Sequence, residues 1–190
     1  MSKAIFIVEY SSIPAGIDSL DRMVKRAPMS IIYAKPICIG KFLIVVGGEV
    51  ENLREARDEV TQVDEKKLIR QHLLTNAHED ILKYFNPAHR EKANMDGKTA
   101  LGILETRDAS SGFQSLDAGL KSGNVRLEEV WIGHFIGGKF CYILSGLVGD
   151  INTALEAAEA ALPEKTLLDK RLIPSPDNMA LEYLIKSYKQ

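Results

Sequence analysis

The chain has 190 residues, 45% of them hydrophobic and 26% charged, which is enough to bury the core of one large domain or two small ones. Its formal charge of -2 gives no basic surface for nucleic acid, and its apolar runs are too short to cross a membrane as a helix. The first residues, MSKAIFIVEY, lack the pattern of a secretory signal, which predicts a cytoplasmic protein with reduced thiols.

The first half of the chain alternates between strand and helix patterns. Short apolar runs predict buried strands, and apolar residues at helical spacing predict helices that turn one face to a sheet. In chain order the predicted elements are a strand at 4–9, a helix at 13–27, strands at 30–35 and 41–47, a helix at 53–63 and a strand at 67–74. The residues expected on the inner faces of the two helices are Ile13, Ile17, Leu20, Val24 and Ala27, then Leu53, Ala56, Val60 and Val63.

The second half of the chain repeats the first. Residues 100–125 match residues 4–29 at eight of 26 positions, among them Glu9, which recurs as Glu105. Further on, GKFCYILSGLV at 138–148 matches GKFLIVVGGEV at 40–50, after two extra residues. The chain is therefore interpreted as a tandem duplication.

The repeat gives the second half the same predicted elements. They are a strand at 100–105, a helix containing Phe113, Leu116 and Leu120, strands at 126–131 and 139–145, a helix containing Ile151, Leu155, Ala158 and Leu162, and a strand at 166–173. Strand, helix, strand, strand, helix, strand is the ferredoxin-like order, so each half is predicted to be an α/β domain of the α+β kind. The expected limits are 1–86 for the first domain, 87–97 for a polar linker and 98–190 for the second domain.

Motifs of the second half resemble a known family. The run ALGILETRDASSGFQSLDAGLKSGNV, the later IGGK loop and the ending RLIPSPD are similar to the domain of bacterial microcompartment shell proteins. The first half departs from that pattern, with Phe6 at a usual glycine and TNAH at 75–78 where the family has its I-P-x-P ending. The resemblance implies a structural shell protein in the cytoplasm, not an enzyme. It implies a homotrimer of tandem domains that imitates a six-sided tile and contacts other shell proteins.

The stretch around Cys38 resembles a narrower group. KPICIGKFLIVVGGEV and HFIGGKF are similar to tandem-domain shell proteins of propanediol-utilising compartments. In that group a pore-loop cysteine of the first domain binds iron, and three such cysteines hold one 4Fe-4S cluster per trimer. The resemblance therefore implies that Cys38 is a metal ligand in the central pore. It also implies electron transfer or cluster delivery across the shell, with an encapsulated redox enzyme as a partner.

Symmetry gives this implied site a physical basis. A cubane cluster usually takes thiolates on its irons, and one cysteine per chain cannot hold it alone. A threefold axis beside Cys38 would bring three thiolates together and leave one iron for another ligand. The matching loop of the second half contains no cysteine, so six thiols would not crowd the axis.

Further residues are predicted to lie around this opening or at the tile edge. The predicted pore-lining residues are Pro36, Ile37, Ile39, Gly40, Phe135, Ile136, Gly137 and Gly138. Pro36 and Gly40 would fix the loop and let it approach the axis closely. Lys35, Lys41 and Lys139 would offset anionic charge near the axis, and Lys25 and Lys121 resemble the edge lysine that packs between tiles.

Other interpretations stay open. Cysteine is often an inert core residue, which is the alternative for Cys38 and the prediction for Cys141. The same tile without a cluster would gate metabolites, and a ring-forming sensor or enzyme on this fold is a third hypothesis. Against the last, the sequence shows no constellation of acid, base and nucleophile, and no zinc spacing among its histidines.

Overall fold

The computed structural model describes residues 3–85, 99–177 and 179–180. Both halves have the predicted order of strand, helix, strand, strand, helix and strand. The expected linker at 87–97 and the domain limits at 1, 86, 98 and 190 lie outside the described residues. Among the helices that are described, none is long and apolar enough to cross a membrane.

The first domain is a four-stranded antiparallel sheet with two helices. Its elements are β1 (Ala4–Tyr10), α1 (Ile13–Arg26), β2 (Ser30–Ile37), β3 (Lys41–Gly48), α2 (Val50–Val63) and β4 (Leu68–Leu74). The strand order β2-β3-β1-β4 places β1 and β3 in the middle. A short 3-10 turn, Cys38–Gly40, joins β2 to β3.

The second domain repeats this arrangement. Its elements are β5 (Ala100–Thr106), α4 (Ala109–Ser122), β6 (Arg126–Ile132), β7 (Phe140–Gly146), α5 (Val148–Ala160) and β8 (Leu167–Ile173). The strand order β6-β7-β5-β8 is the same as in the first sheet. The ferredoxin-like prediction is therefore confirmed for both halves.

A short helix that the sequence did not predict, α3 (Glu79–Tyr84), fastens the first domain to the second. The Tyr84 hydroxyl donates to the backbone oxygen of Val130 at 2.6 Å. The Phe85 ring lies 5.6 Å, centroid to centroid, from Phe113 of α4. A six-residue segment is too short for its apolar spacing to predict a helix, so this helix is found only in the structure.

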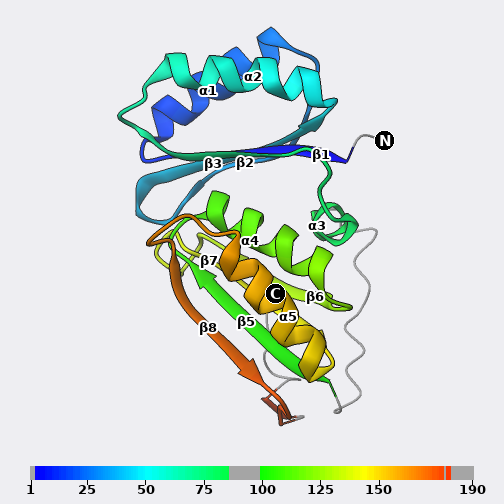
Figure 1. Ribbon diagram of the computed structural model, residues 1–190. Helices are drawn as coiled ribbons and strands as arrows, with labels where there is room; N and C mark the ends of the chain where they lie inside the picture. The colour runs from blue at the N-terminus through cyan, green and yellow to red at the C-terminus, as the bar shows by residue number, and fades with distance from the viewer. Residues whose placement is uncertain (1–2, 86–98, 178, 181–190) are drawn as a thin grey trace.

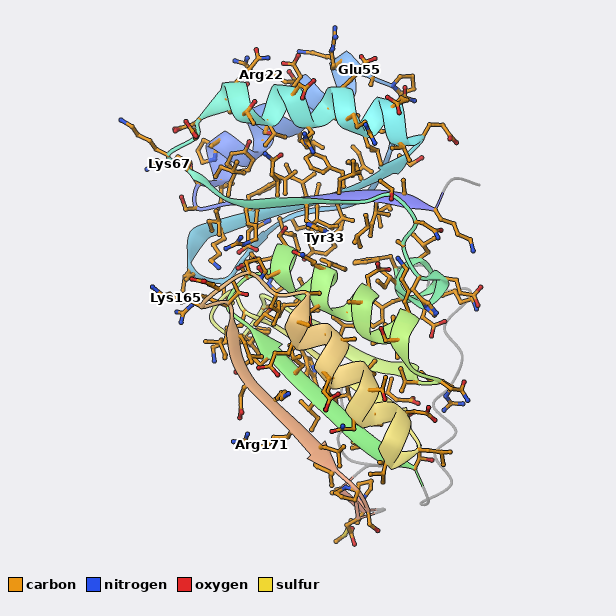
Figure 2. The ribbon with its side chains drawn as sticks, in the orientation of Figure 1. Arg22, Tyr33, Glu55, Lys67, Lys165 and Arg171 are labelled. Atoms are coloured by element: carbon orange, nitrogen blue, oxygen red, sulfur yellow. The ribbon has the colours of Figure 1, made fainter. Side chains whose placement is uncertain are left out.

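The first sheet is covered on both faces. Figure 1 shows α1 and α2 over one face and α4 of the second domain against the other. Phe6 and Val8 belong to the core under α1 and α2, whereas Ile5 and Ile7 belong to a core shared with α4. In Figure 2, Tyr33 of β2 lies in the layer between the first sheet and α4. The continuous apolar run of β1 reflects this burial on two sides.

The predicted inner face of α1 is wrong at two positions. Ile17 and Val24 are 54% and 40% exposed, while Gly16, Ser19 and Met23 are buried. A Cβ on Gly16 would lie 2.5 Å from the Phe42 ring, so the helix approaches the sheet through small residues. Ser19 is turned inward because its hydroxyl accepts a hydrogen bond from Tyr10 at 3.0 Å. The side chains of Ile17 and Val24 are therefore exposed on the outer side of α1.

The matching positions of α4 are buried. Phe113 and Leu120, which correspond to Ile17 and Val24 in the repeat, are 1% and 3% exposed. The helix α4 packs against its own sheet and also against the first sheet. The outer side of this duplicated helix is therefore a contact surface in the second domain and an exposed surface in the first.

Candidate functional site

The two loops predicted to line a pore lie side by side. The backbone N–H of Phe135, in the β6–β7 loop, donates to the Cys38 sulfur across a distance of 2.9 Å. The Lys41 ammonium, at the start of β3, donates to the backbone oxygen of Gly138 at 3.1 Å. Both contacts join residues about half the chain apart, so the duplication brings the equivalent loops of the two domains together.

Glycines make this close approach possible. Gly133 has a φ of +65°, and a Cβ there would lie 2.5 Å from the Cβ of Ile37. Gly138 has a φ of +74°, and a Cβ there would lie 3.0 Å from the backbone oxygen of Cys38. A larger residue at either position would push the loops apart. The local sequence therefore requires small residues where the second loop crosses the first.

The predicted pore-lining residues separate into two groups. Pro36, Ile39, Gly40, Phe135 and Gly137 are exposed, and Ile136 is half-buried. The structure places Ile37 and Gly138 differently from the prediction, because both are buried where the loops meet. A Cβ added to Gly40 would have no described atom within 4 Å, so the positive φ of +75°, not close packing, explains this glycine.

The Cys38 thiol lies at the junction of the two loops. It is partly exposed at the tip of the first loop and accepts the Phe135 amide hydrogen. Amide N–H donors to sulfur are a regular feature around iron–sulfur clusters, where they tune the potential. The residues present therefore fit a thiolate-bound cluster, provided that further thiolates come from other copies. In the described ranges 3–85, 99–177 and 179–180, no three His, Cys, Asp or Glu side chains of one chain gather for a metal.

The second cysteine differs in its surroundings. Cys141 lies in β7, and burial raises the pKa of its thiol to about 12, with a smaller contribution from the Glu105 carboxylate. A thiol with that pKa is almost entirely protonated at neutral pH and is a poor nucleophile and ligand. The structure therefore agrees with the prediction that Cys141 is a packing residue.

A buried ion pair lies beneath the first loop. Glu9 of β1 is fully buried, and its carboxylate accepts a hydrogen bond from the Lys41 ammonium at 2.8 Å. Its other oxygen accepts the backbone N–H of Ala109, the first residue of α4, at 2.7 Å. Burial raises the pKa of the Glu9 carboxyl, and Lys41 offsets part of that rise. One carboxylate thus holds the start of α4 and the lysine that reaches the second loop.

The equivalent pair in the second domain is more open. The Lys139 ammonium donates to Glu105 at 3.0 Å, and both side chains are partly exposed. The sequence predicts Lys41 and Lys139 as counter-charges near an axis. Within the chain each instead pairs with the carboxylate of its own sheet, and Lys35 lies 5.9 Å from the Tyr33 ring centroid.

Sequence reasoning missed the polar contacts that join the domains. Arg70 of β4 lies 3.4 Å from the carboxylate of Asp108, the N-cap residue of α4. The backbone N–H of His78 donates to Asp117 at 2.7 Å. Asp117 also pairs with Lys121, the residue predicted at the tile edge. The spacing of these residues gave no sign of the first two contacts, because each of them spans the two domains.

The Asp117–Lys121 pair of α4 has a counterpart on α1. This helix forms the outer layer of the first domain, on the far side of the first sheet from α4 (Figure 1). Lys25, the other predicted edge residue, pairs with Asp21, and both side chains are more than half exposed. His134 of the second loop lies 3.4 Å from the Tyr33 hydroxyl. The junction of the domains thus contains most of the candidate site, and Lys25 lies apart from it.

Comparisons with known proteins agree with this architecture. The BMC domain family model matches twice, at residues 4–77 and 100–176. The chain is 35% identical over 177 residues to the bacterial microcompartment shell protein PduT of Citrobacter freundii, covering 93% of this chain and 94% of that protein.

Solved structures are similar as well. A microcompartment protein of Desulfitobacterium hafniense DCB superposes with a TM-score of 0.82 and 30% identity, over 96% of this chain and 99% of that one. A fused permuted hexameric shell protein of the RMM microcompartment gives a TM-score of 0.59 at 18% identity, over 83% of this chain and 82% of that one. The second likeness concerns the fold alone.

Proposed function

This chain belongs to the BMC domain family, and from that premise we propose that three copies close into a ring whose centre holds one 4Fe-4S cluster on three Cys38 thiolates. Its family makes the chain a structural protein of the bacterial microcompartment shell in the cytoplasm, and not an enzyme. The ring would be a tile of six domains within that shell. Other shell proteins would be its neighbours.

The difference between α1 and α4 supports the ring. In the second domain α4 packs against the first sheet, and its residues Phe113 and Leu120 are buried in the core that the two domains share. In the first domain the matching residues of α1, Ile17 and Val24, are exposed. An exposed apolar surface of this kind favours contact with a partner of complementary shape. The second sheet of another copy has that shape, because the two domains are repeats.

The second sheet has apolar residues at the receiving positions. Leu101, Ile103 and Ile143 correspond in the repeat to Ile5, Ile7 and Val45, which receive α4 within the chain. Glu105 stands where Glu9 accepts the first N–H of α4. A neighbouring copy would bring the N–H of Ile13 to Glu105 in the same way. Repeating one contact from domain to domain is how a closed ring forms.

The cluster proposal depends on one observation above all. Cys38 is a partly exposed thiol at a loop tip, with an amide N–H directed at its sulfur. When bound, a 4Fe-4S cluster supplies one-electron transfer, here between the cytosol and the interior of the compartment, or is itself delivered to an encapsulated redox enzyme. The chain's own part is to present the thiolate, hold the loop and donate to the sulfur.

Two measurements test this function. Protein purified without oxygen is expected to show the broad visible absorption of an iron–sulfur cluster, with one cluster for three chains by iron analysis. Light scattering is expected to give three times the 21.1 kDa mass of the chain. Cys38→Ser should remove the absorption and leave the ring, while the matched control Cys141→Ser should retain both. A colourless ring after reconstitution would leave a cluster-free tile that gates metabolites, and a monomer would overturn the ring.

A further inference from the structure

Two large apolar side chains stand exposed at the tips of the paired loops. Ile39 is 76% exposed and Phe135 is 94% exposed. Both are next to Cys38, since Ile39 follows it in the chain and the Phe135 backbone N–H donates to its sulfur. Leu147 is exposed to a similar extent, at 70%, but it precedes α5 and lies outside both loops.

Both residues also adopt an unfavourable backbone conformation. The φ angle is +60° at Ile39 and +59° at Phe135, in the left-handed region. Glycine, asparagine and aspartate tolerate this region, whereas a β-branched residue such as isoleucine is a true outlier there. Non-glycine residues in this conformation concentrate at functional sites, where the surroundings hold them. A glycine at either tip would avoid both the strain and the exposed apolar surface. The presence of large apolar side chains at these two positions therefore points to a role for them.

The loop positions are held firmly enough to place these side chains. Lys41 is fixed by buried Glu9 and reaches the backbone oxygen of Gly138 in the second loop. Ile37 packs beneath Gly133 at the base of the same loops. The tips therefore project from a supported base, which holds the backbone of both loops close to Cys38.

We propose that Ile39 and Phe135 of three copies form an apolar collar that keeps water and hydrated solutes away from the Cys38 thiolates. This inference rests on the proposed ring, in which the loops of each copy meet around one axis. Six apolar tips, two from each chain, would then cover one another, which accounts for surfaces that a single chain leaves in water. A narrow apolar constriction excludes water and polar solutes by dewetting. The collar would thus close the pore to metabolites and shield the thiolates.

Alkylation of Cys38 tests the collar without the cluster. The ring is prepared free of iron, kept reduced and treated with iodoacetamide, and modification of the Cys38 peptide is followed by mass spectrometry. Ile39→Asn and Phe135→Asn keep a residue that tolerates positive φ but replace the apolar side chain with a polar one. Each is expected to raise the alkylation rate roughly tenfold, because a wetted opening admits the reagent. The matched control, Leu147→Asn, should leave the rate unchanged.

The outcomes separate the collar from the ring. Light scattering is measured on every variant, and an intact ring in which both asparagine variants react at the wild-type rate would overturn the collar alone. A wild-type chain that is monomeric would overturn the ring, and the collar with it. If an asparagine variant does not assemble, Phe135→Ala removes bulk without adding a polar group and should also speed alkylation. An unchanged rate in that assembled variant would count against the collar.

Discussion

The two cysteines of this chain differ in what surrounds their sulfur atoms. Cys38 lies at a loop tip, partly exposed, with an amide N–H directed at it. Cys141 is also partly exposed, but it lies within a central strand, where burial raises its thiol pKa to about 12. The same side chain is therefore a candidate ligand in one domain and a packing residue in the other.

The raised pKa of Cys141 leads to a prediction about its reactivity. In the native chain at about pH 8, iodoacetamide should leave Cys141 unmodified, because only the thiolate reacts. The reactive form accumulates only as the pH approaches about 12. In urea, where burial is lost, Cys141 should react readily. Peptide mass spectrometry measures both, and equal rates in the two conditions would show that the thiol is not protected.

The Glu9–Lys41 pair gives a second prediction at the residue scale. Lys41→Met leaves the fully buried Glu9 without its cation, which should lower the free energy of unfolding at neutral pH by about 3 kcal/mol. Lys25→Met is the matched control, since it breaks an exposed pair with Asp21 and should cost less than about 1 kcal/mol. Urea denaturation measures both. Equal losses would mean that burial of the pair does not matter.

The pH dependence of the Lys41→Met variant has a definite sign. The folded-state pKa of Glu9 is already raised by burial, and losing Lys41 raises it further. A raised folded-state pKa means that stability is present below the unfolded-state value and is lost as the pH rises through the folded one. The variant should therefore recover part of its lost stability as the pH is lowered from 7 towards the ordinary glutamate range. A loss that is constant with pH would contradict this explanation.

At the scale of elements, α1 and α4 show how one repeated helix acquires two roles. Both follow a central strand, cross their own sheet through a glycine and carry apolar residues at matching outer positions. In α4 those residues are in the core between the domains, and in α1 they face outward. Ring closure is thus proposed to depend on the outer side of α1.

Substitutions on the two helices should separate assembly from folding. Ile17→Ser with Val24→Ser should abolish the ring but change the stability of the single chain little, because both side chains are exposed there. Phe113→Ser, on the matching side of α4, should destabilise the chain itself by about 3 kcal/mol or more. Light scattering and circular dichroism report the two effects. A double serine variant that still forms the ring would show that α1 is not its contact surface.

At the scale of the whole molecule, the surfaces proposed to close the ring lie on other elements than the thiol site. The proposed ring surfaces are the outer side of α1 and the second sheet, whereas Cys38 belongs to the β2–β3 loop. Assembly would therefore rest on apolar burial over helices and sheets, and the cluster would occupy an opening that already exists.

Iron removal tests this separation. An anaerobic chelator should strip the cluster and its visible absorption while light scattering still reports three chains. The collar should also remain, since the loops that carry Ile39 and Phe135 are joined at their base by the Lys41–Gly138 and Ile37–Gly133 contacts. If the ring falls apart as iron leaves, the cluster itself holds the copies together. The Leu147→Asn variant, treated in parallel, should behave as the wild type does.

The sequence alone determined the duplication, the order of strands and helices within each repeat, the family and the loop position of Cys38. Repeats, periodicity and motifs are local in the chain, so no tertiary information is needed to read them. Only the tertiary structure decided that Ile17 and Val24 face outward, that Ile37 and Gly138 are buried, and that Phe135 donates to Cys38. Such facts depend on which surfaces meet across the two domains. The helices α1 and α4 have apolar residues at matching positions but differ in burial, because of these two helices α4 alone packs against a second sheet of the same chain.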